Sequence, residues 1–175
     1  MFRKSLLIAV ALLLVAFMAE KPLAQESGTI QATATVQAGV TVTGNNNLIF
    51  GLVTPGINKA IARTVVGAAG EWHVSGTNGA NVTVDFTLPV TLLHTDGVTT
   101  MPVGFAVGDA AWDNNAVGNQ AVPAGGAINP NASNPTIPLG AAGDLWVWIG
   151  GTVMPPLAQT GGNYSADVVM TITYE

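Results

Sequence analysis

The side chains that could carry chemistry are few and widely spaced. The chain of 175 residues has no cysteine, and its two histidines, His73 and His94, lie in strand-like segments at a spacing that matches no metal motif. It also lacks the G-x-S-x-G motif that would present a nucleophilic serine. Carboxylates that are distant in sequence can still meet in a fold, so an enzyme stays as an alternative. We predict that the chain is not an enzyme and that it holds no cofactor and no metal.

One cluster of oxygen donors occurs at residues 108–115, GDAAWDNN. It contains two aspartates and two asparagines, which are Asp109, Asp113, Asn114 and Asn115. Calcium prefers such oxygen ligands, but these residues do not follow the alternating spacing of a calcium-binding loop. We therefore predict a solvated turn, with a calcium loop as the alternative.

Two aromatic residues share one face of a predicted strand. Trp146 and Trp148 alternate with Leu145, Val147 and Ile149, so the tryptophans point to one side and the aliphatic residues to the other. As candidate surface aromatics, the tryptophans could form a platform for a sugar or for another subunit. The favoured alternative buries both of them beneath residues 109–144.

The N-terminus has the pattern of a secretory signal. Arg3 and Lys4 precede an apolar run of 13 residues, 6–18, which is shorter than the roughly 20 residues of a membrane-spanning helix. We predict a signal peptide at residues 1–24 rather than a membrane anchor. About 150 residues remain, enough for a single domain, which would be secreted to the cell surface by way of the periplasm.

The charge of the mature chain restricts its partners. From residue 25 onward the sequence has two basic and nine acidic residues, a net charge of −7. This argues against nucleic acid or an anionic membrane surface as a partner. Ala, Gly, Val, Thr and Asn dominate, and an uncharged surface of this kind suits a protein that associates with copies of itself.

The longest alternating run is residues 29–42, TIQATATVQAGVTV. Its 14 residues would span roughly 46 Å as one strand at about 3.3 Å per residue, whereas strands usually have about 5–6 residues. Gly39 is a natural place for a bend. We therefore divide the run, with a donor-strand arm at residues 25–37 and the domain at residues 38–175, whose own first strand begins at residues 40–42.

The rest of the chain reads as short strands separated by turns. The turns are expected at residues 44–47 (GNNN), at Pro55-Gly56 and at Asp96-Gly97. No helix is expected after the signal, and the pattern predicts an immunoglobulin-like β-sandwich. The strands are expected at residues 48–54, 60–66, 71–76, 81–88, 90–94, 99–108, 136–139, 145–153 and 164–174.

The last strand ends the chain, because only Glu175 follows Tyr174. A seven-stranded immunoglobulin sandwich normally has a further strand beside this one. We therefore predict an incomplete sandwich with an apolar groove, lined partly by Val168, Met170 and Ile172. The alternating residues of a neighbour's arm would fill this groove and join subunits head to tail. These donor residues are Ile30, Ala32, Ala34 and Val36.

Motifs at the two ends of the mature chain point to a family. Tyr174 is penultimate, Gly162 is fourteenth from the end, residues 48–51 read LIFG, and residues 29–36 read TIQATATV. With these features the chain resembles the fimbrial subunits of chaperone–usher pili, especially the archaic branch and the spore coat protein U group. It is similar also to secreted bacterial Ig-like domains of unknown function. It departs from many pilins in having no disulfide, since it has no cysteine.

The resemblance implies a pilus subunit that polymerises by donor-strand exchange. It also implies a periplasmic chaperone that holds the last strand before an usher assembles the filament. On this strand the resemblance assigns a role to Gly162, Val168, Met170, Ile172 and Tyr174. The main alternative is a self-complete Ig-like surface module that binds a ligand, such as a glycan, as a monomer.

Overall fold

A computed structural model describes residues 31, 33–34, 39–132 and 136–175. The predicted signal peptide and most of the predicted arm lie outside the described residues. In the described part every regular element is a β-strand, so the predicted all-β fold class is confirmed. None of the described segments is a helix of the length and hydrophobicity needed to cross a membrane.

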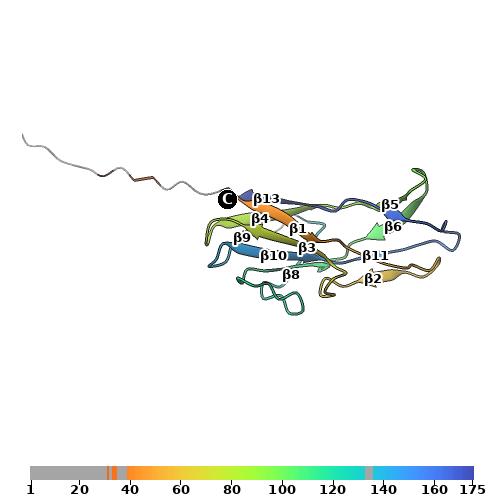
Figure 1. Cartoon of the computed structure of the whole chain (residues 1–175), viewed down its shortest axis with the longest axis horizontal. Coiled ribbons are helices and arrows are strands. Elements are labelled where there is room, and N and C mark those ends of the chain that lie inside the picture. Colours follow the sequence, from red (N-terminus) through yellow and green to blue (C-terminus); the bar gives the residue numbers. More distant parts are fainter. Residues whose placement is uncertain (1–30, 32, 35–38, 133–135) are drawn as a thin grey trace, which may run out of the picture. The chain divides into compact units, whose positions relative to one another are not determined.

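Most strands follow one another with short connections, but long ones join β1 to β2, β7 to β8 and β11 to β12 (Figure 1). Their bounds are β1 Thr41–Asn46, β2 Lys59–Ile61, β3 Gly70–Ser75, β4 Asn81–Thr87, β5 Thr91–His94, β6 Thr100–Gly104, β7 Ala110–Asp113, β8 Ala127–Ile128, β9 Thr136–Pro138, β10 Asp144–Ile149, β11 Gly151–Val153, β12 Tyr164–Ser165 and β13 Val169–Tyr174.

The strands form three antiparallel sheets. The first has the order β1-β3-β10-β7-β8, the second β12-β5-β6-β11-β2, and the third β13-β4-β9. β4 leads into β5, and β12, which pairs with β5, leads into β13, which pairs with β4, so the second and third sheets are joined along these two connections. The chain also runs from the first sheet into the second between β10 and β11, at Gly150.

The apolar residues of the sheets pack into two clusters. The larger lies between the first and third sheets and includes Val74, Val147 and Val84, all fully buried. The smaller contains Met101, Val103 and Val153, with several half-buried residues packed around it. Since inner and outer faces alternate along the strands, each sheet contributes every second residue to a cluster, which is what a β-sandwich requires.

Some sequence predictions are wrong, and the side chains explain why. Residues 44–47 are not a turn, because β1 continues through Gly44 to Asn46 with a bulge in its pairing to β3. The amide of Asn46 donates to the carbonyl of Ala69 at 2.7 Å, which holds this polar stretch along the sheet edge. Residues 48–54 form no strand, and the strand predicted at 60–66 shrinks to β2.

The predicted solvated turn at residues 108–115 is also wrong. Ala110 and Ala111 are fully buried in β7, between β8 and β10. Burial disfavours a charge on Asp113, but N–H groups of Asn115, Asn119 and Ala124 donate to its carboxylate and outweigh that effect. The pKa of Asp113 is therefore below its ordinary value, and the carboxylate holds the following loop instead of facing solvent.

The loop after β7 covers the two tryptophans. Trp148 is 1 % exposed, and its indole N–H donates to Glu71 Oε2 at 2.8 Å. Trp146 stacks on His73 with ring centroids 4.2 Å apart, and Gly118 lies against its indole ring. Trp148 is therefore not a surface aromatic, in agreement with the alternative that places it beneath residues 109–144.

We expect Trp148→Ala to lower the free energy of unfolding by about 3–5 kcal/mol, because it removes a buried indole and leaves a cavity. Chemical denaturation followed by circular dichroism measures this. Val117→Ala, at an exposed position of the covering loop, is the control and should change stability little. A Trp148→Ala protein as stable as the parent would contradict the buried role.

Candidate functional site

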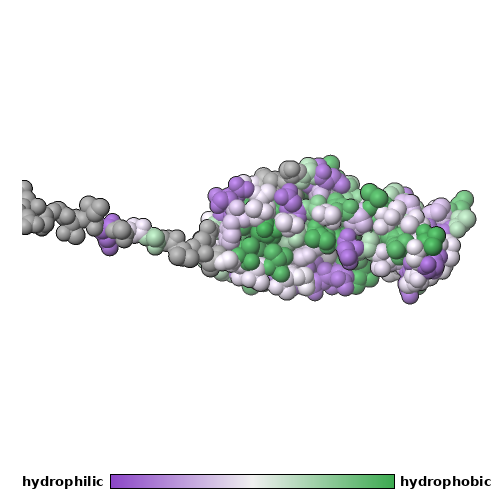
Figure 2. All heavy atoms as spheres, turned by 90° about the horizontal axis from the view of Figure 1, so that it is seen from above, coloured by the Kyte–Doolittle hydropathy of each residue, from purple (hydrophilic) through white to green (hydrophobic). Residues whose placement is uncertain are grey.

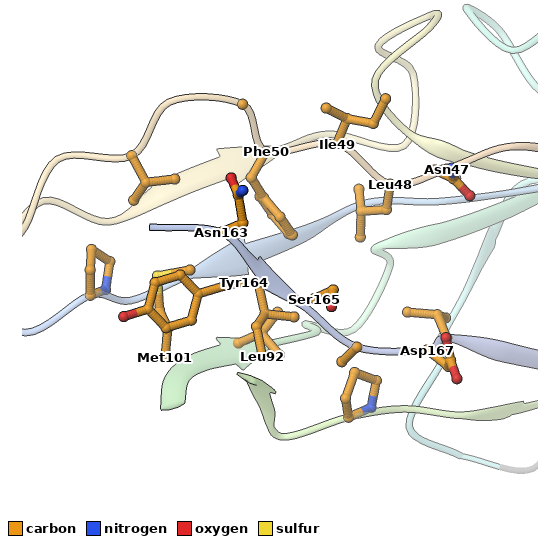
Figure 3. A pocket seen from close by; sticks show the side chains of 18 of the residues that line it. Asn47, Leu48, Ile49, Phe50, Leu92, Met101, Asn163, Tyr164, Ser165 and Asp167 are labelled. Atoms are coloured by element: carbon orange, nitrogen blue, oxygen red, sulfur yellow. The ribbon is translucent and has the colours of Figure 1, made fainter. Parts of the chain in front are cut away.

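A groove of about 970 Å³ lies among the described residues. One wall is formed by residues 44–53 and the other by residues 159–168. Figure 3 shows residues 47–50 along one side, Asn163, Tyr164, Ser165 and Asp167 across from them, and Leu92 and Met101 near Tyr164 on the side away from residues 47–50. The floor consists mainly of apolar side chains, which are Trp72, Leu92, Met101, Val103, Phe105 and Ile149.

In the first wall, the side chains of residues 48–50 alternate between facing inward and facing outward, although these residues form no strand. Leu48 and Phe50 are half-buried, whereas Ile49 between them is exposed. The Ile49 N–H donates to the carbonyl of Ala68 at 2.7 Å, and Lys59 Nζ donates to the carbonyl of Leu52 at 2.8 Å. These two bonds fix residues 47–53, which belong to no sheet in the described chain, whereas residues 44–46 are the end of β1.

The second wall contains the two-residue strand β12 and ends just before β13 begins. Tyr164 pairs with His94, and their rings lie 4.9 Å apart. The Tyr164 hydroxyl donates to the carbonyl of Thr160 at 2.7 Å. Regular pairing then stops at residues 166–168, opposite the stretch that contains Pro89, a residue without an N–H to donate. This wall is therefore a short ladder followed by an unpaired segment.

The strand edges on this side of the sandwich have no partner in the described residues. β1 pairs only with β3, and β13 pairs only with β4. Val42 is opposite Val74 and shares its inner face, yet Val42 is 39 % exposed while Val74 is fully buried. Ile172 is likewise only half-buried opposite the fully buried Val84. Inner-face side chains thus lack cover along both edges.

A fixed polar turn lies beside the second wall of the groove, next to Gly162 and Asn163. The N–H of Asp96 donates to His94 Nδ1 at 3.1 Å, and the Thr99 hydroxyl and the Val98 N–H donate to the Asp96 carboxylate. The bond from Thr99, followed by that from Val98, holds the pKa of Asp96 well below its ordinary value. These bonds fix the β5–β6 turn, and the Thr95 N–H, which donates to the carbonyl of Asn163 at 3.1 Å, ties that turn to the second wall.

The histidines do not form a catalytic or metal centre together. His73 Nε2 lies 2.8 Å from Asp144 Oδ1 in the first sheet, whereas His94 belongs to the second sheet. No group of three or more metal-binding side chains occurs among the described residues. The groove can therefore bind by shape, apolar contact and backbone hydrogen bonds.

The residues predicted for the site divide into three groups. Gly162 and Val168 line the groove. Met170, Ile172 and Tyr174 lie farther along β13 and pack on the larger cluster. Of the predicted donor residues, only Ala34 is described, and it is exposed and in no strand, while Ile30, Ala32 and Val36 lie outside the described residues.

Sequence reasoning missed the floor of the groove. Met101 and Val103 alternate in a segment that was predicted as a strand, so their common face could have been noted. Their position beside Phe50 and Tyr164 depends on long-range packing, which no local pattern contains.

The chain matches no protein-family model and no curated protein. Its resemblance to fimbrial subunits therefore remains a prediction, and the groove has to be interpreted from its own geometry and chemistry.

We expect Gly162→Ala to lower stability by about 1–3 kcal/mol, because the φ of 144° disfavours any residue with a Cβ and that Cβ would collide with the His94 ring. Gly161→Ala is the control, since a Cβ there meets nothing within 4 Å. Thermal melts of both variants measure the difference. Equal melting temperatures for the two would show that the close approach of Gly162 to His94 carries no constraint.

Proposed function

We propose that the chain is a secreted structural subunit whose groove accepts the N-terminal arm of another copy. Subunits joined in this way would form a head-to-tail surface filament, as donor-strand exchange does. One observation carries the proposal, which is the apolar groove on the side of the sandwich where β1 and β13 have unpaired edges. An immunoglobulin-like sandwich that lacks one strand would have such a gap.

The form of the groove favours an extended peptide over a compact ligand. Backbone runs along both sides of it, and a strand laid between them could bond to backbone while its alternate side chains enter the apolar floor. A small-molecule site typically has a few convergent polar groups, whereas polar lining residues here, such as Asn47, Asn163 and Asp167, are spread along the two walls. The second wall contributes residues 161–168, of which only Tyr164 and Val168 are even half-buried.

The predicted arm has the length and composition that this groove requires. Residues 30–36 would span roughly 23 Å as a strand, close to the reach of the eight residues 161–168. Residues 29–37 have no charged side chain, so none would have to be desolvated in the groove. The alternate positions, Ile30, Ala32, Ala34 and Val36, would face the floor.

A neighbour's arm suits the groove better than the chain's own arm. If the arm folded back through a two-residue turn at residues 38–39, residues 30–36 would lie beside residues 41–47. Ser27 would then be opposite Phe50, so polar residues would meet the apolar floor. An arm from another copy is free to choose the register that places Ile30–Val36 over it.

The remaining sheet edges are poor acceptors. Among the described residues β8 has two residues and β2 has three, while β9 contains Pro138. Short edges and proline are common protections against unwanted strand pairing. The two edge strands of six residues, β1 and β13, are both on the groove side. This asymmetry favours strand addition at one place.

The runner-up function is a monomeric surface module that binds a ligand such as a glycan. Burial of Trp148 removes half of the aromatic platform that would support it. A periplasmic chaperone and an usher are proposed partners of the last strand, on the resemblance alone. An enzyme is the third class of function.

We expect Ala34→Asp to abolish polymerisation of the mature protein. A carboxylate in the apolar groove would be unpaired and would cost several kcal/mol. Thr35→Asp is the matched control, because it adds the same charge on the opposite face of the arm. Electron microscopy and size-exclusion chromatography measure assembly. Equal loss in both variants, or in neither, would contradict the alternating insertion of the arm.

Deleting residues 29–37 should give a monomer with an empty groove and low stability. A synthetic peptide of residues 29–37 should then raise its melting temperature, because it binds only the folded state. The peptide with Ala34→Asp is the control and should have no effect. A deleted protein that still forms filaments, or that melts high and ignores the peptide, would disprove the proposal.

A further inference from the structure

We propose that the loops at one end of the sandwich form the docking face for the body of the next subunit. This inference rests on the proposed function and adds a second contact between copies, outside the groove. We call the end where β1 begins the entry end, and the opposite end the far end. The far end is where β5 and β6 meet in Figure 1.

Hydrogen bonds and strand register define the two ends. At the entry end Thr41 pairs with Ser75, and the Thr77 N–H donates to the Tyr174 hydroxyl at 3.1 Å. At the far end the Thr95 N–H donates to the carbonyl of Asn163 at 3.1 Å. The C-terminal segment runs from the far end, where β12 pairs with β5, to the entry end, where the end of β13 pairs with the start of β4.

Large apolar side chains are exposed at the far end. Leu52 is 95 % exposed, Leu157 87 % and Ile57 61 %. Figure 2 shows hydrophobic residues among the spheres at this end. The entry-end loops, residues 76–80 and 140–143, contain no large apolar residue and expose small ones such as Ala141 and Ala142. The far end thus offers an apolar surface, whereas these two entry-end loops offer small residues.

The far-end loops are held in place before any partner arrives. The Gly56 N–H donates to the carbonyl of Pro155 at 3.0 Å, which ties the loop before β2 to the loop after β11. Leu157 lies against Gly56, so a Cβ at Gly56 would meet the Leu157 side chain. Gln159 Nε2 donates to the carbonyl of Thr100 at 3.2 Å. Ordered loops lose little entropy on docking.

The connection between arm and domain brings the two bodies together. Val36, the last donor residue, and Thr41, the first residue of β1, are five Cα steps apart and can be separated by at most about 18 Å. A donor whose arm fills a groove must therefore place its entry end close to one mouth of that groove. The loops around this mouth become part of the contact.

The exposed side chains indicate at which mouth of the groove the donor body docks. A donor body at the acceptor's entry end would bring two entry ends together, and each arm could then fill the other's groove in a closed pair. A donor body at the far end leaves the acceptor's own arm free for a third copy. Because Leu52, Ile57 and Leu157 surround the far mouth, docking there buries apolar surface.

Paired cysteines test this contact directly, since the chain has none of its own. The test variant contains Leu157→Cys and Ala141→Cys, and the control contains Val117→Cys and Ala141→Cys, with Val117 exposed on the loop after β7. Both assembled proteins are treated with a short bismaleimide and run on a denaturing gel. We expect a ladder of covalent multimers for the test variant and at most a trace for the control.

Two outcomes would overturn the docking face, namely no ladder from assembled test variant, or ladders of equal yield in both variants. The groove is checked separately with the deleted protein and the peptide of residues 29–37. If the peptide stabilises that protein while the ladder is absent, the docking face fails and the proposed function stands. If the peptide has no effect, the proposed function itself fails.

Discussion

Two edge strands, β1 and β13, have no second partner among the described residues and leave inner-face side chains exposed. The proposed assembly depends on covering these side chains. Val42 on β1 and Ile172 on β13 face the interior of the sandwich, but among the described residues no strand lies beside either edge to cover them. Phe50 and Leu92 are also only half-buried, beside the groove. Full burial of one such side chain contributes about 1.5–3 kcal/mol, so covering several of them is worth as much as a large part of a domain's stability.

This constraint links folding to assembly. A chain without cysteine has no disulfide to stabilise it, and its core is divided into two clusters of which the smaller is incompletely covered. A strand supplied by another copy would complete that cluster and stabilise the folded state in proportion to its effective concentration. The few charges on the domain reduce repulsion between copies, which suits a protein whose stable form is a polymer.

Much of the fold could be predicted, because the alternation of apolar and polar residues is visible in the sequence wherever one face of a strand is buried and the other is exposed. Residues 71–76, 81–88 and 90–94 alternate and became β3, β4 and β5. The turn predicted at GNNN failed because asparagine amides bond to the neighbouring strand, and β7 was missed because its alanines are buried on both faces. The inward faces of Leu48 and Phe50 follow from their spacing, but the floor beneath them comes from β5 and β6 through long-range packing.

The central claim is that a strand from another copy covers the two open edges. Hydrogen–deuterium exchange, resolved by peptide, tests this when the assembled protein is compared with the monomer that lacks residues 29–37. The account predicts that amides of β1, residues 47–53 and residues 161–174 exchange much more slowly in the assembly, whereas those of β10, which already has partners on both sides, change little. Unchanged exchange along both edges in a protein that has polymerised would contradict it.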